Sequence, residues 1–226
     1  MKYEENPFEE SQVAQEWIAN IENEADGVRD REVYPLLEKW VGEIKPEVLV
    51  EIGSGQGICS DKINCGDGKY IGVEPSLGLT ARAQELYNDE QREFVVGNGY
   101  ELPLANEIAD AGFTVNVWFH LEDLPRASKE LARILKPDGQ YLIITANPDT
   151  YATWESFYFD HEKIGNKIVG KVNTPARPMS KNTFYQHSLQ EITNALNDAG
   201  LTIDELFPLG NIGENTNIFI TIKGHK

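Results

Sequence analysis

Apolar segments of strand length alternate with helical segments through the middle of the chain, and no other feature of the sequence limits the fold as much. The first of them, VLVEIGSGQG at residues 48–57, stops at three alternating glycines. The segments expected to be strands are residues 48–53, 70–74, 93–97, 110–116 and 140–146. Helical periodicity over residues 77–88 and 123–135 separates several of them. This repetition predicts right-handed crossovers and a parallel sheet that is covered on both faces.

Further elements are expected on either side of this core. Residues 9–24 and 31–43 precede it and have apolar residues at helical spacing. A helix at 188–199 is expected to follow it. The connection between the final strands, 202–208 and 217–223, is too short for a crossover helix, so these strands should pair antiparallel. The prediction is an α/β fold: a doubly wound, seven-stranded, mostly parallel sheet with a C-terminal antiparallel strand and helices on both faces.

Length, charge and cysteine content limit the classes of function. A chain of 226 residues suffices for one substantial domain. The net charge of −17 argues against sequence-independent binding to nucleic acid phosphates or to an anionic membrane surface. Cys59 and Cys65 have the spacing of neither a metal site nor a disulfide framework. The acidic first residues are unlike a secretory signal, and no apolar run approaches the roughly 20 residues that span a bilayer. We therefore expect a cytoplasmic protein with no metal and no membrane contact.

Ligands of open parallel sheets bind beyond the carboxyl ends of the strands. The first strand delivers the chain into the glycine loop, where backbone can approach a ligand closely. Glu74 ends the second strand, and its carboxylate could accept hydrogen bonds from the two hydroxyls of a ribose. Asn98 follows the third strand and could bond a base edge, with Gly99 allowing the approach. These residues predict a nucleoside site, for a dinucleotide or for another adenosine derivative.

Glu51 favours a cationic ligand over a dinucleotide. It lies in the strand just before the glycines, where a buried carboxylate is costly unless a cation or a hydrogen-bond donor meets it. Its charge would repel a pyrophosphate and stabilise an ammonium group. S-adenosylmethionine has a ribose, an adenine, an ammonium and a sulfonium but no phosphate, so it fits Glu51, the glycine loop and Glu74 together. The alternative is that Glu51 bonds only local backbone amides.

The chain resembles the class I S-adenosylmethionine-dependent methyltransferases of the small-molecule type. The segments that carry the resemblance are VEIGSGQG (50–57), YIGVEPS (70–76), FVVGNGYELPL (94–104), IADAGFTVNVWFHLED (108–123) and ELARILKPDGQYLIIT (130–145). It covers roughly residues 45–146, and the last two strands suit the reversed hairpin with which that family ends. The resemblance implies a Rossmann-like fold and S-adenosyl-L-methionine as cofactor. It also implies that the Leu-Lys-Pro-Asp-Gly segment at 135–139 is a turn before the fifth strand.

The resemblance carries cofactor-binding roles over to particular residues. The glycine loop would hold the methionine portion, Glu51 would face the ammonium and Glu74 the ribose hydroxyls. Asn98 stands where the family most often has an aspartate that accepts from the adenine amino group, and an amide oxygen can accept there without charge assistance. The residues expected to bind the cofactor are Glu51, Gly53, Ser54, Gly55, Gly57, Glu74, Pro75, Asn98, Gly99, Asn116 and Val117.

The reaction of such a fold is an in-line displacement, for which positioning matters most. A base is needed only if the methyl acceptor must first lose a proton. His120, four residues past the end of the fourth strand, is the catalytic candidate. Alternatively, it packs against the cofactor or caps the following helix. Asp123 is expected to be an N-cap rather than a base.

Specificity for the methyl acceptor is expected from residues 147–187, a long irregular insertion rich in aromatic residues. Residues 1–44 could form the opposite wall as a helical lid, where Arg29 or Arg31 could pair with the cofactor's carboxylate. The residues expected to contact the methyl acceptor are Trp118, Tyr151, Trp154, Tyr158 and His187. The whole chain is thus interpreted as one domain, with a cofactor-binding core at 45–146 and a C-terminal helix and strand hairpin at 188–226.

The predicted function is transfer of the methyl group of S-adenosylmethionine to a small organic acceptor, by a monomer or homodimer that contacts no nucleic acid. Two other classes stay open. An NAD(P)-dependent dehydrogenase has a similar sheet, although Glu51 disfavours the phosphates of its cofactor. A non-catalytic adenosyl-binding protein is compatible with every residue above, because catalysis by positioning requires no nucleophile.

Overall fold

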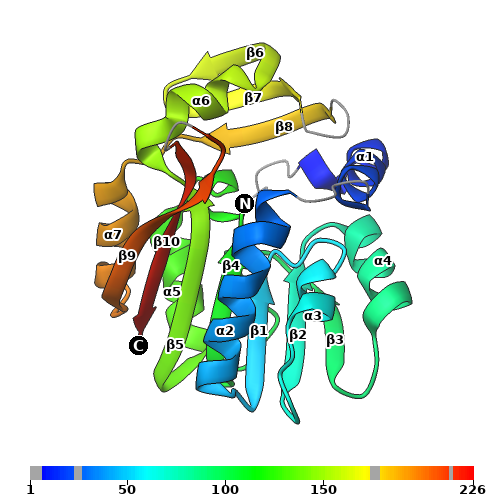
Figure 1. Ribbon diagram of the computed structural model, residues 1–226, viewed down its shortest axis with the longest axis vertical. Helices are drawn as coiled ribbons and strands as arrows, with labels where there is room; N and C mark the ends of the chain where they lie inside the picture. Colours follow the sequence, from blue (N-terminus) through cyan, green and yellow to red (C-terminus); the bar gives the residue numbers. More distant parts are fainter. Residues whose placement is uncertain (1–6, 23–26, 174–178, 214–215) are drawn as a thin grey trace.

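The central sheet has seven strands in the order β3-β2-β1-β4-β5-β10-β9. The computed structural model describes residues 7–22, 27–173, 179–213 and 216–226 (Figure 1). The strands of the sheet are β1 (Val48–Ile52), β2 (Lys69–Glu74), β3 (Arg92–Val96), β4 (Ala109–Val115), β5 (Leu135–Ala146), β9 (Thr202–Asn211) and β10 (Asn217–His225). Neighbours among β1 to β5 pair in parallel, whereas β10 runs antiparallel to both β5 and β9. The predicted α/β fold and its mostly parallel seven-stranded sheet are confirmed.

Helices cover both faces of this sheet, because successive side chains of a strand point to opposite faces. The helices around it are α2 (Tyr34–Ile44), α3 (Ile58–Lys62), α4 (Leu77–Tyr87), α5 (Leu124–Ile134) and α7 (Leu189–Asp198). Val50 of β1 packs in one core cluster with Leu131 of α5 and Leu196 of α7. The preceding residue, Leu49, packs in a second cluster with Trp40 of α2. The doubly wound arrangement therefore follows from the continuously apolar strands.

The N-terminal helices differ in detail from the predicted ranges. The first is α1 (Ser11–Glu22), preceded by a 3₁₀ turn η1 (Pro7–Glu9), and residues 23 and 24 of the predicted helix lie outside the described residues. The second begins as one π-helical turn, η2 (Arg29–Val33), which continues into α2. Asp123 accepts a hydrogen bond from the backbone N–H of Arg126 at 3.1 Å and caps α5, as predicted.

The Leu-Lys-Pro-Asp-Gly segment at 135–139 belongs to β5 instead of forming a separate turn before it. Leu135 already pairs with Ala109 of β4. The end of the chain extends the ladder on the other side, since the Asp138 N–H donates to the carbonyl of Lys226 and the Lys226 N–H to that of Gly139. Asp138 has φ +62°, so the irregularity that the sequence indicates is present as a kink within the strand.

The prediction that residues 147–187 are irregular is wrong. The segment forms η4 (Pro148–Thr150), α6 (Tyr151–Ser156) and a separate antiparallel sheet of β6 (Tyr158–Ile164), β7 (Lys167–Val172) and β8 (Met179–Tyr185). We call residues 147–187 the cap; residues 174–178 of it lie outside the described residues. The cap lies over the carboxyl ends of the central strands, with β8 next to α1 (Figure 1). Val13 of α1 packs with Ile168 and Phe184 of the cap in a third apolar cluster.

Within the described ranges, no helix is both long and apolar enough to cross a lipid bilayer.

Candidate functional site

A cavity of about 1050 Å³ lies between the carboxyl ends of the parallel strands and the cap. The loops after β1, β2, β3 and β4 form one side of it, and segments of η1, α1, η2 and the cap form the other. Small-molecule pockets typically have volumes of about 300–1,000 Å³. The cavity therefore has room for two small molecules side by side.

The glycine loop after β1 has a left-handed backbone that brings it very close to its neighbours. Gly53 and Gly57 have φ values of +75° and +83°. A Cβ on Gly53 would lie 2.3 Å from a methyl carbon of Val117, and one on Gly57 would lie 2.9 Å from the ring of Phe94. Only glycine accommodates both the backbone angle and the close approach. Gly53, Ser54 and Gly55 line the cavity, whereas Gly57 is not among its lining residues.

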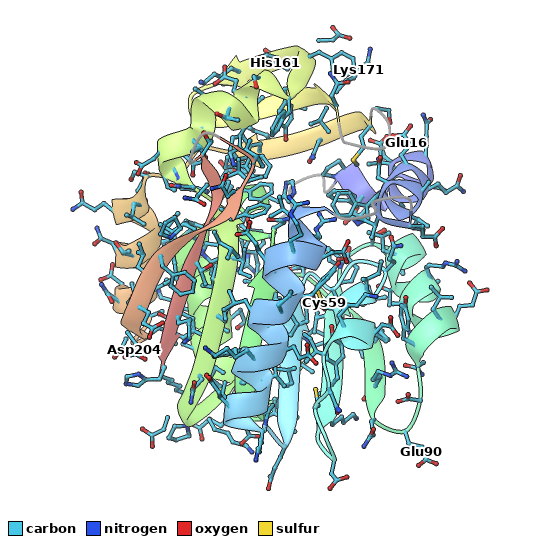
Figure 2. The ribbon with its side chains drawn as sticks, viewed as in Figure 1. Glu16, Cys59, Glu90, His161, Lys171 and Asp204 are labelled. Atoms are coloured by element: carbon cyan, nitrogen blue, oxygen red, sulfur yellow. The ribbon has the colours of Figure 1, made fainter. Side chains whose placement is uncertain are left out.

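Glu51 is a buried carboxylate at the edge of the cavity, with 2% of its surface exposed. The hydroxyl of Tyr70 and the thiol of Cys59 donate hydrogen bonds to it. Burial raises the pKa of Glu51 to about 7 despite those hydrogen bonds, and the charge of Glu74 contributes to the rise. Its hydrogen bonds thus come from interior side chains (Cys59 is labelled in Figure 2). The carboxylate would be stabilised by a cationic group in the cavity.

Glu74 is a second buried carboxylate at the same edge of the sheet, 6% exposed and also lining the cavity. Its two oxygens accept hydrogen bonds from the backbone N–H groups of Ser76 at 2.9 Å and of Gly55 at 3.1 Å. Burial raises the pKa of Glu74 to about 7 despite these bonds. One side chain therefore connects the end of β2 to the glycine loop.

The residues that follow β3 and β4 also face the cavity. The side-chain oxygen of Asn98 accepts a hydrogen bond from the N–H of Tyr100 at 2.9 Å, which leaves the amide nitrogen as a donor toward a ligand. Asn116 has φ +59°, a conformation that asparagine tolerates better than most residues. Its Oδ1 is buried and has no hydrogen-bond partner among the described residues.

Two further buried polar side chains in the glycine loop lack partners within the described part of the chain. They are Ser54, through Oγ, and Gln56, through both Oε1 and Nε2. Both line the cavity, and Gln56 is only 2% exposed. A buried polar atom without a partner costs about 1–3 kcal/mol, so a polar ligand that bonds these atoms would be favoured.

His120 lines the cavity from the 3₁₀ turn η3 (Trp118–His120) after β4. Its ring lies against Phe8 and Phe119, with centroid distances of 5.8 and 4.3 Å. Its Nδ1 is hydrogen-bonded to the carbonyl oxygen of Thr183 in β8. Because a carbonyl can only accept, Nδ1 is the donor, and Nε2 of the neutral ring carries a lone pair. Burial lowers the pKa of His120 to about 4, so the ring is neutral at pH 7.

Comparison with known proteins places this site in a family. Residues 50–143 match the family described as a methyltransferase domain. The fold is similar to that of an S-adenosylmethionine-dependent methyltransferase from Mesorhizobium loti, with a TM-score of 0.65 and 14% identity over 89% of this chain and 99% of that one. Residues 50–143 thus carry a methyltransferase domain, on a fold similar to that of an S-adenosylmethionine-dependent enzyme.

Two curated relatives show how far the similarity extends. One is an uncharacterized methyltransferase of Mycolicibacterium vanbaalenii, 27% identical over 128 residues, which are 56% of this chain and 48% of that protein. Another is a tRNA (carboxymethyluridine(34)-5-O)-methyltransferase of Mus musculus, 31% identical over 137 residues, which are 57% of this chain and 20% of that protein. The chain therefore spans half or less of the length of these relatives.

The residues of the methyltransferase domain fit S-adenosylmethionine. Glu51 and Glu74 would meet its ammonium and its ribose hydroxyls, and the unpartnered atoms of Ser54, Gln56 and Asn116 offer further polar contacts. Arg29 and Arg31 also line the cavity, and the guanidinium of Arg29 lies 5.2 Å from the centroid of the Trp17 ring. Of the predicted cofactor residues, all but Gly57 line the cavity. Gly57 lies away from the cavity, close to the ring of Phe94.

The residues predicted to contact the methyl acceptor divide into two groups. Trp154 and Tyr158 line the cavity beneath the cap. Trp118, Tyr151 and His187 do not line it. The Trp118 side chain is 1% exposed in the core cluster beneath α5 and α7. The Tyr151 hydroxyl donates to the carbonyl of His187 at 2.5 Å, and the His187 Nε2 donates to the carbonyl of Leu121 at 2.7 Å, so these two residues connect the ends of the cap.

Sequence reasoning missed several residues of the methyltransferase site. Tyr70 and Cys59 bond Glu51, and Phe8 and Trp17 bring the N-terminal segment to the cavity wall. Gln56 could have been identified, because it directly follows Gly55, which faces the cavity from the same loop. The contacts of Tyr70 and Phe8 depend on packing between distant segments, for which the sequence contains no local signal.

Proposed function

We propose that this chain transfers the methyl group of S-adenosylmethionine to a small organic acceptor. The observation that supports this most is the pair of buried carboxylates, Glu51 and Glu74, beside a glycine loop and a cavity with room for a second molecule. The hydrogen bonds that these carboxylates accept from described residues come from uncharged donors, so a ligand that brings positive charge would be favoured. A dinucleotide would add negative charge at the same place, which disfavours the dehydrogenase alternative.

When bound, S-adenosylmethionine supplies a methyl group on a positively charged sulfur. The chain's own contribution is mainly orientation, which in model systems is worth about 7–11 kcal/mol. The glycine loop and Glu74 hold the adenosyl end, and the cap encloses the methyl acceptor. His120 presents Nε2 to the acceptor and can take up its proton. Because its pKa is about 4, the ring is a weak base, and we expect positioning to contribute more than proton transfer.

The tRNA methyltransferase relative raises a different acceptor class. A net charge of −17 opposes binding to tRNA phosphates, which supports a small molecule instead. Labelled cofactor decides between the two: transfer of the labelled methyl group into bulk tRNA would replace our proposal, and transfer into a small-molecule extract would support it. We also propose a cytoplasmic location, which fits the free thiols of Cys59 and Cys65.

Calorimetric titration tests the cofactor. S-adenosylmethionine and S-adenosylhomocysteine should bind, and NAD should not. Glu74→Ala should weaken S-adenosylmethionine at least about tenfold, or about 1.4 kcal/mol. Glu85→Ala, a side chain on α4 that is 68% exposed, is the matched control and should bind normally. Binding of NAD alone would support the dehydrogenase, and normal cofactor binding without turnover on any acceptor would support the non-catalytic alternative.

A further inference from the structure

The part of the cavity beneath the cap is lined by aromatic rings. We call it the acceptor chamber, and its rings are those of Phe8, Trp17, Phe119, Trp154, Phe157 and Tyr158. Trp154 lies at its centre, with ring centroids 5.3 Å from Phe119 and 5.9 Å from Phe157. The Trp154 Nε1 donates to the carbonyl of Ile218 at 2.8 Å, which fixes the orientation of the ring. A chamber of fixed rings favours a flat, apolar ligand.

The cap contributes no charged side chain to this chamber among the described residues, whereas the guanidinium of Arg29 lies 5.2 Å from the Trp17 ring on the opposite wall. The charged side chains that line the cavity among the described residues are Glu9, Arg29, Arg31, Glu51 and Glu74. All five come from the N-terminal segment or from the ends of β1 and β2. Every described residue of the cap that lines the cavity is uncharged. An ionised ligand group would therefore be desolvated beneath the cap without a counter-ion from the cap, which is costly.

Several polar side chains of the cap line the cavity, among them Asn182 and Tyr158, and His120 faces them from η3. His120 offers the Nε2 lone pair, because the Thr183 carbonyl engages Nδ1. Tyr158 offers a hydroxyl, since its ring lines the cavity and stacks on Phe184 with centroids 6.1 Å apart. Neither Nε2 of His120 nor the Tyr158 hydroxyl has a hydrogen-bond partner among the residues that the structure describes. A ligand hydroxyl could donate to Nε2 and accept from the tyrosine.

We infer that the methyl acceptor is an uncharged aromatic ring compound that carries a hydroxyl, and that this hydroxyl donates a hydrogen bond to Nε2 of His120. The inference depends on the proposed methyl transfer in one respect, namely that the ligand of the chamber is the methyl acceptor. The preference of the chamber for such a ligand is a binding property and can be measured without turnover.

The experiment uses the full chain saturated with S-adenosylhomocysteine and three probes of similar shape. 2-Naphthol is titrated calorimetrically, and naphthalene and 2-naphthoate compete with it. 2-Naphthol should bind about tenfold more tightly than naphthalene, which lacks the hydroxyl. It should bind more than about thirtyfold more tightly than the naphthoate anion, which meets no counter-ion from the cap. Tighter binding of 2-naphthoate, or no binding of any ring while S-adenosylhomocysteine binds, would overturn the inference and leave the proposed function intact.

Two variants test the contact itself. His120→Phe keeps a ring but removes Nε2, so 2-naphthol and naphthalene should bind equally. The matched control is His225→Phe, on β10, where the side chain is 41% exposed and does not line the cavity, and this variant should keep the tenfold difference. If His120→Phe does not fold, as judged by its thermal transition, Tyr158→Phe replaces it and should reduce the difference about threefold. Retention of the full difference in the folded variants contradicts the contact.

Discussion

The loops at the ends of β1 and β2 bury charge, whereas the cap above them buries rings. Glu51 and Glu74 lie in the first region with pKa values raised to about 7. The cap contributes Trp154, Phe157 and Tyr158 to the same cavity, and its described lining residues include no charge. Under the proposed function, the first region would meet the charged cofactor and the second an apolar acceptor. The first part of the site is constrained by close backbone approaches and the second by packing of side chains.

The largest difference between the two regions should appear at glycines. Gly53→Ala places a Cβ at φ +75° and 2.3 Å from Val117, so we expect a loss of about 2–4 kcal/mol in the free energy of unfolding. Its affinity for S-adenosylmethionine should fall more than about a hundredfold, because the loop must move. Urea denaturation and calorimetry measure the two effects.

Gly165 in the cap is the control, since it has φ +61° but nothing within 4 Å of an added Cβ. Gly165→Ala should cost only about 1 kcal/mol and leave cofactor binding unchanged. An equal loss of cofactor affinity in both variants would show that the close approach at Gly53 is unimportant.

The next difference concerns charge and its dependence on pH. The folded-state pKa of Glu51, about 7, lies above its ordinary value of 4.5. The stability that this group contributes is therefore present below about pH 4.5 and is lost as the pH rises through about 7. Glu51→Gln removes the titration, so the variant should gain about 2–3 kcal/mol over the wild type between pH 5 and pH 8.

For Glu155 of the cap, the contribution to stability should depend on pH in the opposite direction. The hydrogen bond from Lys163 lowers its pKa, so its small contribution is present at neutral pH and is lost as the pH falls through the lowered value. Denaturation of Glu51→Gln and Glu155→Gln across this pH range compares the two directly. A pH-independent effect of Glu51→Gln would mean that Glu51 is not desolvated.

The smallest difference concerns the contact between α1 and the cap. One carboxylate oxygen of Glu16 accepts from the N–H of Ser180 at 2.7 Å and from its hydroxyl at 2.8 Å. Glu16→Ala should destabilise β8 by about 1 kcal/mol, seen as about fivefold faster hydrogen exchange of the Ser180 amide. Glu10→Ala removes only the exposed pair with Lys181 and should have almost no effect. Equal exchange in both variants would show that α1 does not hold the cap.

The sequence was sufficient for the central sheet and insufficient for the cap, for a physical reason. Strands that are buried on both faces are continuously apolar and stand out from their surroundings. In the cap, β6 is exposed along almost its entire length after Tyr158, so its residues show no apolar alternation. β5 begins before the predicted residue 140 because Leu135 pairs with Ala109 of β4 and because Asp138 and Gly139 bond Lys226 at the end of the chain. These contacts are not visible in local sequence.

A similar limit applies to the site. The cofactor residues could be predicted from topology, since the carboxyl ends of parallel strands meet at one edge. The direction in which a side chain points within a turn could not be predicted from topology. Trp118, Phe119 and His120 are consecutive, yet only the last two face the cavity. In a 3₁₀ turn, which has about three residues per turn, successive side chains point about 120° apart, so one of three neighbours must face elsewhere.

The hydrogen bond between Tyr151 and the His187 carbonyl closes the base of the cap. The chain leaves the sheet after β5 and returns before α7 at two points that this hydrogen bond holds together. Because the entropy of closing a loop grows only slowly with its length, insertions in exposed parts of the segment between these two residues cost little entropy. Under the proposed function, exchange of this segment would alter the site for the methyl acceptor, whereas the residues proposed to hold S-adenosylmethionine lie outside it.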